Sequence, residues 1–487
     1  MSSTRMACPQ RSVSNTLPRT ASEHRSYTRK FKSVGPIFTD VRCMMASSLV
    51  CRWTVLLVFC VVLAWPVWAL GDPEPSDTTR VRVRLNNKSV IESVDLTVKE
   101  GPVAVHLPDG GRPVMRLQSG ETTTIGIRQN DVFVRRGNNG LYATKLRLRP
   151  TGTSAKWALA FKNGTRTYTG SLYLAPAPES GLLVVNNVPL EDYVASVVAS
   201  EYGLDDRAGR KAMAVVARTY GLFTSEKFGG TYDQADGTAS QVYEGVGAVT
   251  SASRRAAEST RGEVLTYDEA LIQSVYFSSS GGHTADNEAV WNAKEPIPYL
   301  RGKDDPYDSN SPHHSWSASV PRSQLLQVLT RAHGSLVKGF TIDERSSDGR
   351  VKTINLLQSS GSPAEMNAND FRLVVNRGVD GNPLKSTWFD ARRSGNRYVF
   401  DGRGFGHGVG LSQWGAHEMA KRGKSYRDIL TFYYTDVRIE QLGDVDKDPR
   451  DAPVARTPPT PKPEPGASPA TDSQEPSVDT DQRRIGW

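Results

Sequence analysis

The chain has 487 residues, of which 38% are hydrophobic, and a formal net charge of +8 at pH 7. This length has room for two or three domains and for a substantial core. Residues 1–43 hold eight Lys or Arg residues against two acidic ones, and Arg52 adds another cation, so the remaining chain is nearly neutral. A nearly neutral body without a basic stripe argues against nucleic-acid binding.

Residues 53–70 are apolar, follow Arg52 and are interrupted by Pro66. The stretch is short for a membrane span, and the small residue Ala69 suits signal peptidase. We expect residues 44–70 to be a signal peptide cleaved after Ala69, or else an uncleaved membrane anchor. Residues 1–43 are a misassigned start or a basic extension. Either reading exports the body to the cell envelope, periplasmic or extracellular.

All cysteines of the chain lie at or before this hydrophobic stretch, at Cys8, Cys43, Cys51 and Cys60. The exported body therefore has no disulfides, no thiol nucleophile and no cysteine-rich zinc site.

Residues 80–175 carry short runs of β-forming residues, separated by turn signals such as Asn163-Gly164. The clearest runs are residues 81–85, 132–136, 145–149 and 157–161. We predict a β-rich accessory region here. Its sequence is compatible with a binding element or with a part that docks against the rest of the chain.

A further strand, residues 181–187, precedes a helix that Pro189 is suited to begin. Leu190, Val194 and Val197 form its apolar stripe, and Glu201, three turns after Leu190, falls on that same stripe. Partial desolvation there would raise the pKa of a carboxyl group and suit it to general acid catalysis. A solvated carboxylate at the helix end is the alternative, which periodicity by itself favours.

A second helix is predicted over about residues 208–227, with Arg218 beside its apolar stripe. The guanidinium would point towards Glu201 or simply edge the helix. A third helix (248–261) and two strands (263–267 and 272–277) follow. The next residues, SSSGGHT, combine small residues that let a backbone approach a ligand with hydroxyls that can bond it, or form an ordinary loop.

Residues 321–333 are predicted as a helix, and residues 339–375 as strands with a hairpin near Asp348. Residues 402–416, GRGFGHGVGLSQWGA, alternate glycine with other residues before a helix that begins near Leu411. The spacing fits neither the GxxxxGK(S/T) loop nor the GxGxxG loop, the two common nucleotide-binding motifs. It lets the chain lie flat against a ligand or a strand while presenting His407 and Gln413. Residues 445–487 are rich in Pro, Ser, Thr and charge, which predicts a disordered tail.

Several motifs between about residues 167 and 441 together resemble the SpoIID/LytB family of bacterial cell-wall proteins. They are GLLVVNNVPLEDYVASVVASEYG, KAMAVVARTY, YFSSSGGHTADNEAVW, PYLRGKDDPYD and GRGFGHGVGLSQWGAHEMAKRGKSYRDIL. Members such as SpoIID are lytic transglycosylases, which cut glycan strands of peptidoglycan, preferentially strands already stripped of stem peptides by an amidase. The LytB side of the family is described as amidase enhancers.

The resemblance implies that Glu201 is the catalytic residue and that Arg218 contributes to the active site. It also implies a glycan-binding role for residues of the other motifs: Tyr220, Ser279, Gly281, His283, Trp291, His407, Gln413 and Trp414. Some spore-forming members bind zinc through cysteine and histidine near the Ser/Gly loop. This chain has no cysteine there, so we predict no metal and no cofactor.

One carboxyl group suffices for a lytic transglycosylase, because the 6-hydroxyl of muramic acid replaces water. A hydrolase needs a second carboxylate, for which Asp304, Asp305 and Glu191 are the candidates. The alternatives are therefore a hydrolytic muramidase and a non-catalytic, glycan-binding amidase enhancer. The expected partners are glycan strands and a cell-wall amidase.

For the fold we predict an α+β architecture. A SpoIID-like catalytic domain (176–444), with a groove floored by the catalytic helix, would follow the β-rich region.

Overall fold

The computed structural model describes residues 79–152, 155–223, 228–291, 293 and 295–444. The predicted signal segment (44–70), the basic extension (1–43) and the predicted tail (445–487) lie outside the described residues. Within the described part the protein is mixed α+β, as predicted. No helix in this part of the chain is long and apolar enough to cross a membrane.

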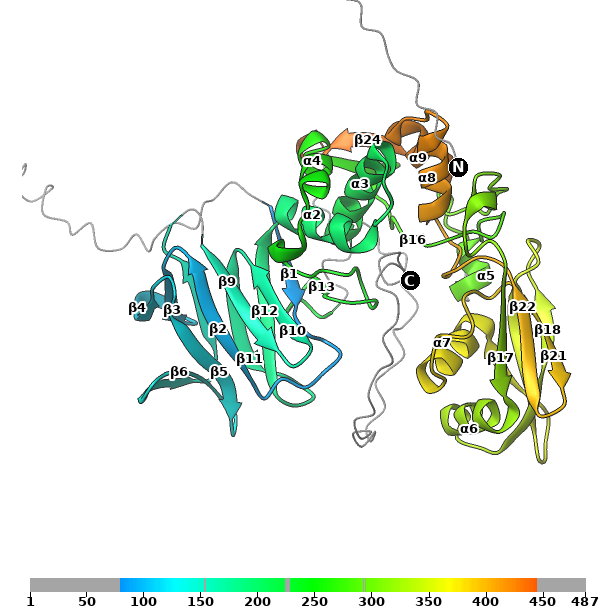
Figure 1. Cartoon of the computed structure of the whole chain (residues 1–487), viewed down its shortest axis with the longest axis horizontal. Helices are drawn as coiled ribbons and strands as arrows, with labels where there is room; N and C mark the ends of the chain where they lie inside the picture. Colours follow the sequence, from blue (N-terminus) through cyan, green and yellow to red (C-terminus); the bar gives the residue numbers. More distant parts are fainter. Residues whose placement is uncertain (1–78, 153–154, 224–227, 292, 294, 445–487) are drawn as a thin grey trace, which may run out of the picture. The chain divides into compact units, whose positions relative to one another are not determined.

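The N-terminal β region contains two sheets, most of whose strands are drawn in blue to blue-green in Figure 1. The seven-stranded sheet has the order β13 (Gln234–Ala235), β1 (Arg80–Arg84), β12 (Leu182–Pro189), β11 (Ser171–Pro176), β8 (Leu146–Pro150), β3 (Val103–Leu107) and β4 (Gly110–Leu117). The six-stranded sheet has the order β10 (Gly164–Tyr168), β9 (Lys156–Phe161), β2 (Ser93–Glu100), β5 (Thr122–Arg128), β6 (Asp131–Arg136) and β7 (Asn139–Ala143). The four strands predicted here are confirmed as β1, β6, β8 and β9.

Alternation of apolar and polar residues directs one face of each strand inward. In β1, Val81 and Val83 are buried, while the arginines that alternate with them are only half-buried. The inward residues of both sheets belong to one hydrophobic cluster, which also contains the apolar stripe of the helix that follows β12. The β region therefore shares its core with the predicted catalytic helix.

That helix, α2 (Leu190–Glu201), begins directly after Pro189 at the end of β12. Leu190, Val194 and Val197 are all buried, as the periodicity predicts. Two helices, α3 (Arg207–Phe223) and α4 (Ser251–Ser259), pack against α2. In turn, α3 packs against α8 (Gln413–Lys421), α9 (Tyr426–Tyr433) and the sheet of β14 (Glu263–Tyr267), β15 (Ala270–Leu271) and β24 (Arg438–Gln441). A two-stranded parallel sheet, β16 (Tyr276–Phe277) and β23 (Leu411–Ser412), completes this part.

Residues 316–402 build a second hydrophobic cluster. Its sheets are β17 (Trp316–Pro321), β22 (Arg397–Gly402) and β21 (Phe389–Ser394), and β18 (Val337–Arg345), β19 (Val351–Gln358) and β20 (Ala364–Asn367). Two helices, α6 (Arg322–His333) and α7 (Ala368–Gly378), pack with them. Trp316 pairs with Gly402, so the chain enters and leaves this segment at the same point, as an inserted module does.

Two expectations about secondary structure are wrong. The predicted strand 272–277 is reduced to β16, because β15 ends at Leu271 and the two belong to different sheets. The strands and hairpin predicted over residues 339–375 are confirmed as β18, β19 and β20, but from Ala368 onward the chain forms α7 instead. Asn367 caps α7 by accepting hydrogen bonds from the N–H groups of Asn369 and Asp370. Phe371 and Val375, four residues apart, form its buried side, so helical periodicity outweighed β propensity here.

Gly170 lies where the chain crosses from β10 of one sheet to β11 of the other. Its φ is +80°, and a Cβ atom there would lie 2.2 Å from the carbonyl oxygen of Asn187 in β12. We expect Gly170→Ala to lower the free energy of unfolding by about 3 kcal/mol, combining left-handed strain with a backbone clash. Gly120→Ala is the matched control, since its φ is +88° and its surroundings are open. Urea unfolding that gave equal losses for both would contradict the close packing of this crossing.

Candidate functional site

Glu201 is the last residue of α2 and is 4% exposed. Its Oε1 accepts a hydrogen bond of 2.7 Å from the N–H of Val242. Burial raises the pKa of Glu201 to about 7, although the Val242 N–H and the Tyr276 side chain both act to lower it. The carboxyl group therefore exchanges its proton near neutral pH, which is the property that a general acid needs.

Tyrosines surround this carboxyl group. Burial and the charge of Glu201 raise the pKa of Tyr220 to about 12, and they also raise the pKa of Tyr276 well above its usual range. Burial, with smaller contributions from Tyr220 and Glu201, likewise raises the pKa of Tyr193, whose hydroxyl donates to Gln241 at 2.7 Å. All three phenols stay protonated at neutral pH, so the site offers hydroxyl groups without a second negative charge.

Several buried polar atoms in this part of the described chain have no hydrogen-bond partner of good geometry. They are Ser200 Oγ, Gln241 Nε2, the Tyr276 hydroxyl, Ser278 Oγ, Gln413 Oε1 and Trp414 Nε1. The effect of Tyr276 on Glu201 is thus a close electrostatic contact rather than a well-formed hydrogen bond. Each unpaired buried group costs free energy unless a ligand or water satisfies it, so their presence near Glu201 fits a binding site.

Gln413 connects the glycine-rich motif to Glu201. Its Nε2 donates a 2.9 Å hydrogen bond to the main-chain carbonyl of Glu201, which belongs to the last turn of α2. Trp414 follows, with its ring 5.8 Å from that of His417 in an edge-to-face arrangement. Two of the predicted glycan-binding residues therefore lie at the helix end that carries Glu201.

The Ser/Gly loop, residues 278–283, is held by a buried carboxylate that the sequence analysis missed. Asp308 is 0% exposed and accepts hydrogen bonds of 2.8 Å from the N–H groups of Ser280 and Gly281. It also accepts from the hydroxyl of Ser279 at 2.9 Å. Asp308 is the final residue of the PYLRGKDDPYD motif, so its motif, although not its role, was visible in the sequence.

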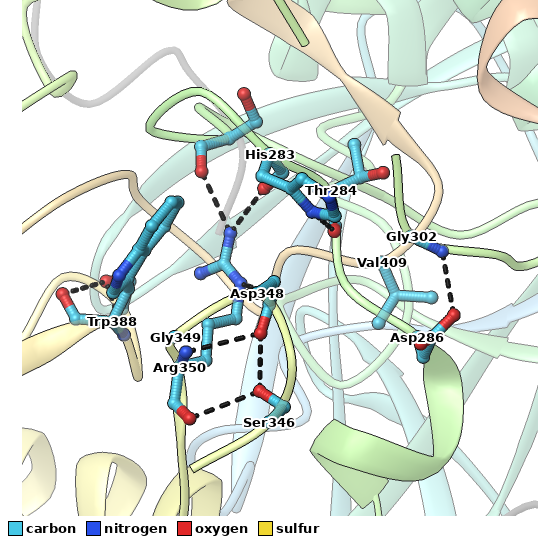
Figure 2. Close-up of polar contacts among 12 residues, drawn as sticks. His283, Thr284, Asp286, Gly302, Ser346, Asp348, Gly349, Arg350, Trp388 and Val409 are labelled. Atoms are coloured by element: carbon cyan, nitrogen blue, oxygen red, sulfur yellow. Dashed lines mark hydrogen bonds and ion pairs between the residues drawn. The ribbon is translucent and has the colours of Figure 1, made fainter. Parts of the chain in front are cut away.

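Arg350 also holds this loop, and Figure 2 shows its guanidinium directed at the main chain of His283. It follows the β18–β19 turn, is 2% exposed and pairs with Asp348 at 2.9 Å. Its guanidinium donates to the carbonyl oxygens of Ser280 and His283, each at 2.8 Å, and lies 5.1 Å from the ring centre of Trp388. The inserted module thereby fixes the loop. Nothing in the spacing of the sequence indicates this contact.

The alternating glycines run against this loop, which bears out one of the two predicted arrangements. Ser279 and Phe405 form a β-bridge. A Cβ atom at Gly404 would lie 2.7 Å from the carbonyl oxygen of Ser279, and a Cβ atom at Gly408 would lie 2.8 Å from the guanidinium of Arg350, so both positions are too close for a side chain. His407 packs 5.4 Å from the ring of Trp291. Burial and nearby arginines lower the pKa of His407 to about 3, so it is neutral and accepts a hydrogen bond from the Val409 N–H.

Arg218 does not lie beside Glu201. Its side chain is 0% exposed and pairs with Glu191, with the nearest atoms 2.7 Å apart, while also donating to the carbonyls of Glu263 and Ala257. Glu191 is in the first turn of α2, and ten residues of helix, about 15 Å, separate it from Glu201. Of the two orientations predicted for Arg218, the one towards Glu201 is therefore wrong. Arg218, in α3, joins that helix to α2, α4 and β14. Its ion pair also gives Glu191, a candidate for the second carboxylate of a hydrolase, a structural role.

The remaining candidate residues near the Ser/Gly loop are His283, Asp304 and Asp305. His283 is partly exposed, with Nε2 3.8 Å from a carboxylate oxygen of the exposed Asp304. Asp305 is buried and accepts from the Tyr433 hydroxyl at 3.0 Å, and burial raises its pKa to about 6. Within the described residues no group of three or more His, Cys, Asp and Glu side chains could hold a metal ion.

The site thus belongs to an α+β protein with a buried, readily protonated glutamate at the end of a core helix. Residues 178–267 match the family model described as stage II sporulation protein, and residues 293–410 match a domain of unknown function. Stage II sporulation protein D of Bacillus subtilis is 30% identical over 311 residues, covering 59% of this chain and 86% of that protein. The corresponding protein of Bacillus amyloliquefaciens is 31% identical over 276 residues, covering 53% and 76%.

The amidase enhancer of Bacillus subtilis is 28% identical over 379 residues, covering 68% of this chain and 50% of that protein. The chain belongs to the SpoIID/LytB family of cell-wall proteins. The domain matched at residues 293–410 includes Arg350, so the contact that fixes the Ser/Gly loop comes from a part of the chain with no described function.

The raised pKa of Glu201 predicts a pH-dependent cost to stability. The folded state binds this proton more tightly than the unfolded state, whose carboxyl titrates near 4.5, so stability falls as pH rises from about 4.5 to 7. Glu201→Gln removes this titration. It should therefore be more stable than the wild type at pH 8, by about 3 kcal/mol, with the difference vanishing near pH 4.5. Urea unfolding across this range measures it, with the exposed Glu258→Gln as control. A pH-independent difference would contradict the raised pKa.

The ion pair of the buried Arg218 with the partly buried Glu191 predicts a structural defect for Arg218→Gln. The substitution leaves the Glu191 carboxylate, whose side chain is 14% exposed, without its cation and removes donors from the carbonyls of Glu263 and Ala257, which costs about 1–3 kcal/mol of unfolding free energy. Thermal and urea unfolding measure the loss. If Arg218→Gln kept wild-type stability and lost only activity, the positioning role of Arg218 would be refuted and a role in contact with substrate restored.

Proposed function

We propose that this protein is a peptidoglycan lytic transglycosylase, with Glu201 acting first as general acid and then as general base. The observation that carries the proposal is the burial of Glu201, which sets its pKa at about 7. At neutral pH such a group is present in both protonation states and can perform both steps. Family membership supports a cell-wall substrate.

The proposed reaction uses one carboxyl group. Protonated Glu201 gives its proton to the oxygen that joins muramic acid to N-acetylglucosamine, and the bond from the anomeric carbon to that oxygen breaks. The 6-hydroxyl of the same muramic acid then bonds to the anomeric carbon, while ionised Glu201 takes the hydroxyl proton. The products are a 1,6-anhydromuramic end and a free 4-hydroxyl on N-acetylglucosamine. No water is consumed.

We propose that the glycan lies in a groove with the C-terminal end of α2 at its floor. Tyr220, Gln413 and Trp414 would line it near Glu201. The Ser/Gly loop with Ser279, Gly281 and His283 would line it further along, as would the pair of Trp291 and His407. Since Glu201 is only 4% exposed, the glycan reaches it by displacing neighbouring side chains, and the unpaired atoms of Gln413 and Trp414 suit that rearrangement.

The second candidate is a non-catalytic amidase enhancer that binds glycan and recruits a cell-wall amidase. The match to the Bacillus subtilis protein named amidase enhancer, over 68% of this chain, favours it. A hydrolytic muramidase is the third reading. Its second carboxyl group would be Asp305, which is buried and whose pKa is raised to about 6. In each case the protein acts outside the cytoplasmic membrane, on exported glycan.

The test is to incubate the full chain and Glu201→Gln with amidase-treated glycan strands and to read the products by mass spectrometry. We expect the wild type to release fragments with 1,6-anhydromuramic ends. Glu201→Gln should lower the rate by at least about 100-fold, because proton transfer by a positioned group contributes about 10²–10⁴-fold.

Glu258→Gln, on the exposed face of α4, is the control and should match the wild type. Reducing muramic ends would make the protein a hydrolase and direct attention to Asp305. Glycan binding without any cleavage, combined with stimulation of an added amidase, would establish the amidase enhancer instead.

A further inference from the structure

A cavity of about 570 Å³ is lined entirely by residues of α3 and α4, two helices that pack against each other (Figure 1). Pockets that bind small molecules usually hold about 300–1,000 Å³, so this cavity is large enough for a ligand. Its charged lining residues are four cations and one acid: Arg207, Arg210, Lys211, Arg255 and Glu258. The cavity therefore carries an excess of three positive charges.

The spacing of residues along the two helices produces this combination of space and charge. Arg207, Arg210 and Lys211 are three and four residues apart, which places their side chains on one face of α3. On α4, Ala252 and Ala256 are four residues apart and also line the cavity. Because alanine side chains are short, they leave a space that the longer cationic side chains surround.

Little negative charge compensates these cations. Arg210 pairs with Asp205 at 3.1 Å, but the Asp205 side chain is 99% exposed, so solvent screens the pair. Arg207 and Arg255 have no ion-pair partner among the described residues. Like charges three or four residues apart on a helix repel each other. An anion bound in the cavity would relieve this repulsion.

Neighbouring arginines of the same helical region are compensated. Arg254, adjacent to Arg255 on α4, pairs with Asp192 at 2.6 Å. Arg427 of α9 pairs with Glu263 at 2.6 Å. The uncompensated charge is thus confined to the residues that line the cavity, which distinguishes the cavity from an ordinary solvated surface.

The types of cation indicate a phosphate group as the ligand. Arginine presents a planar fork that binds phosphate oxygens in pairs, and lysine adds a compact charge. The ammonium of Lys211 lies 5.4 Å from the ring centre of Tyr426, a contact that orients the side chain and leaves its charge unneutralised. A phosphate monoester carries nearly two negative charges and three acceptor oxygens, whereas a carboxylate carries one charge and two oxygens. Three excess positive charges therefore match phosphate better.

The cavity is separate from the site at Glu201. Lys211 and Tyr220 are nine residues apart in α3, about two and a half turns, so their side chains project from opposite sides of the helix. Tyr220 belongs to the tyrosines around Glu201, whereas Lys211 lines the cavity beside α4. A ligand in the cavity consequently does not occupy the proposed catalytic site.

We propose that the cavity between α3 and α4 binds a phosphate group, carried by a small organic phosphate or by the headgroup of an anionic lipid. Arg207 and Arg255, one from each helix, hold the phosphate, and Arg210 and Lys211 complete its surroundings. Glu258 opposes the bound charge and is not one of its ligands. This inference goes beyond the proposed cleavage of glycan and does not rest on it.

The test titrates the full chain with three compounds of similar size: glycerol 3-phosphate, glycerate and glycerol. Isothermal titration calorimetry at low salt gives each dissociation constant. We expect glycerol 3-phosphate to bind at least about tenfold more tightly than glycerate, because it offers more charge and more acceptors to the same forks. Glycerol should show no binding, and the preference for phosphate should fall as salt rises.

Arg207→Gln combined with Arg255→Gln should weaken the binding of glycerol 3-phosphate at least about tenfold. Arg128→Gln combined with Arg135→Gln, two exposed arginines of the six-stranded sheet, is the charge-matched control and should bind as the wild type does. Equal thermal midpoints establish that both double variants are folded.

Co-sedimentation with vesicles of phosphatidylglycerol or phosphatidylcholine distinguishes the two sources of phosphate. If Arg207→Gln with Arg255→Gln also lowers binding to phosphatidylglycerol vesicles, and the control does not, the ligand is a lipid headgroup. If vesicle binding is unchanged, it is a soluble phosphate. Equal affinities for glycerol 3-phosphate and glycerate would overturn the proposal, because they would indicate general attraction of anions. Equal losses of phosphate binding in the two double variants would overturn it as well.

Discussion

Burial of one carboxyl group at the end of a core helix is the constraint on which the rest of this site depends. The apolar stripe of α2 packs into a core shared with the N-terminal sheets, which carries Glu201 out of water with it. The low dielectric of that position disfavours its charged form and brings its pKa to about 7. The surrounding phenols stay neutral, so they do not add a charge that would push the pKa further.

Two contacts then fix what surrounds Glu201. Gln413 joins the glycine-rich motif to the last turn of α2, while the Ser/Gly loop is held through its N–H groups by Asp308 and through its carbonyls by Arg350. Because Arg350 belongs to the inserted module, that module contributes directly to the geometry of the loop. The hydrogen bond from Gln413 to Glu201 joins two motifs more than 200 positions apart. Separately, Arg218 and Glu191 secure the opposite end of α2.

Local patterns carried much of this account. Alternation predicted β1, β6, β8 and β9, and three- and four-residue spacing predicted α2 and placed Glu201 on its apolar stripe. Periodicity by itself favoured a solvated Glu201, and the packing of α2 in the structure shows that it is buried. Contacts that depend on tertiary structure could not be predicted from sequence patterns. The spacing of Arg218 in α3 left its direction open, and only the packing of α3 against the start of α2 selects Glu191. Asp308 and Arg350 likewise act through loops whose paths no periodicity encodes, and α7 was mistaken for a strand because its cap at Asn367 was overlooked.

The account is tested most directly by titrating the carboxyl group of Glu201 itself. Carbon-13 NMR of the protein labelled at glutamate side chains, compared with Glu201→Gln to assign the signal, gives the protonation midpoint. The account predicts a midpoint of about 7, more than two units above the ordinary value of 4.5. A midpoint near 4.5 would mean that Glu201 is a solvated carboxylate, and the single-glutamate mechanism would then have no proton donor at neutral pH.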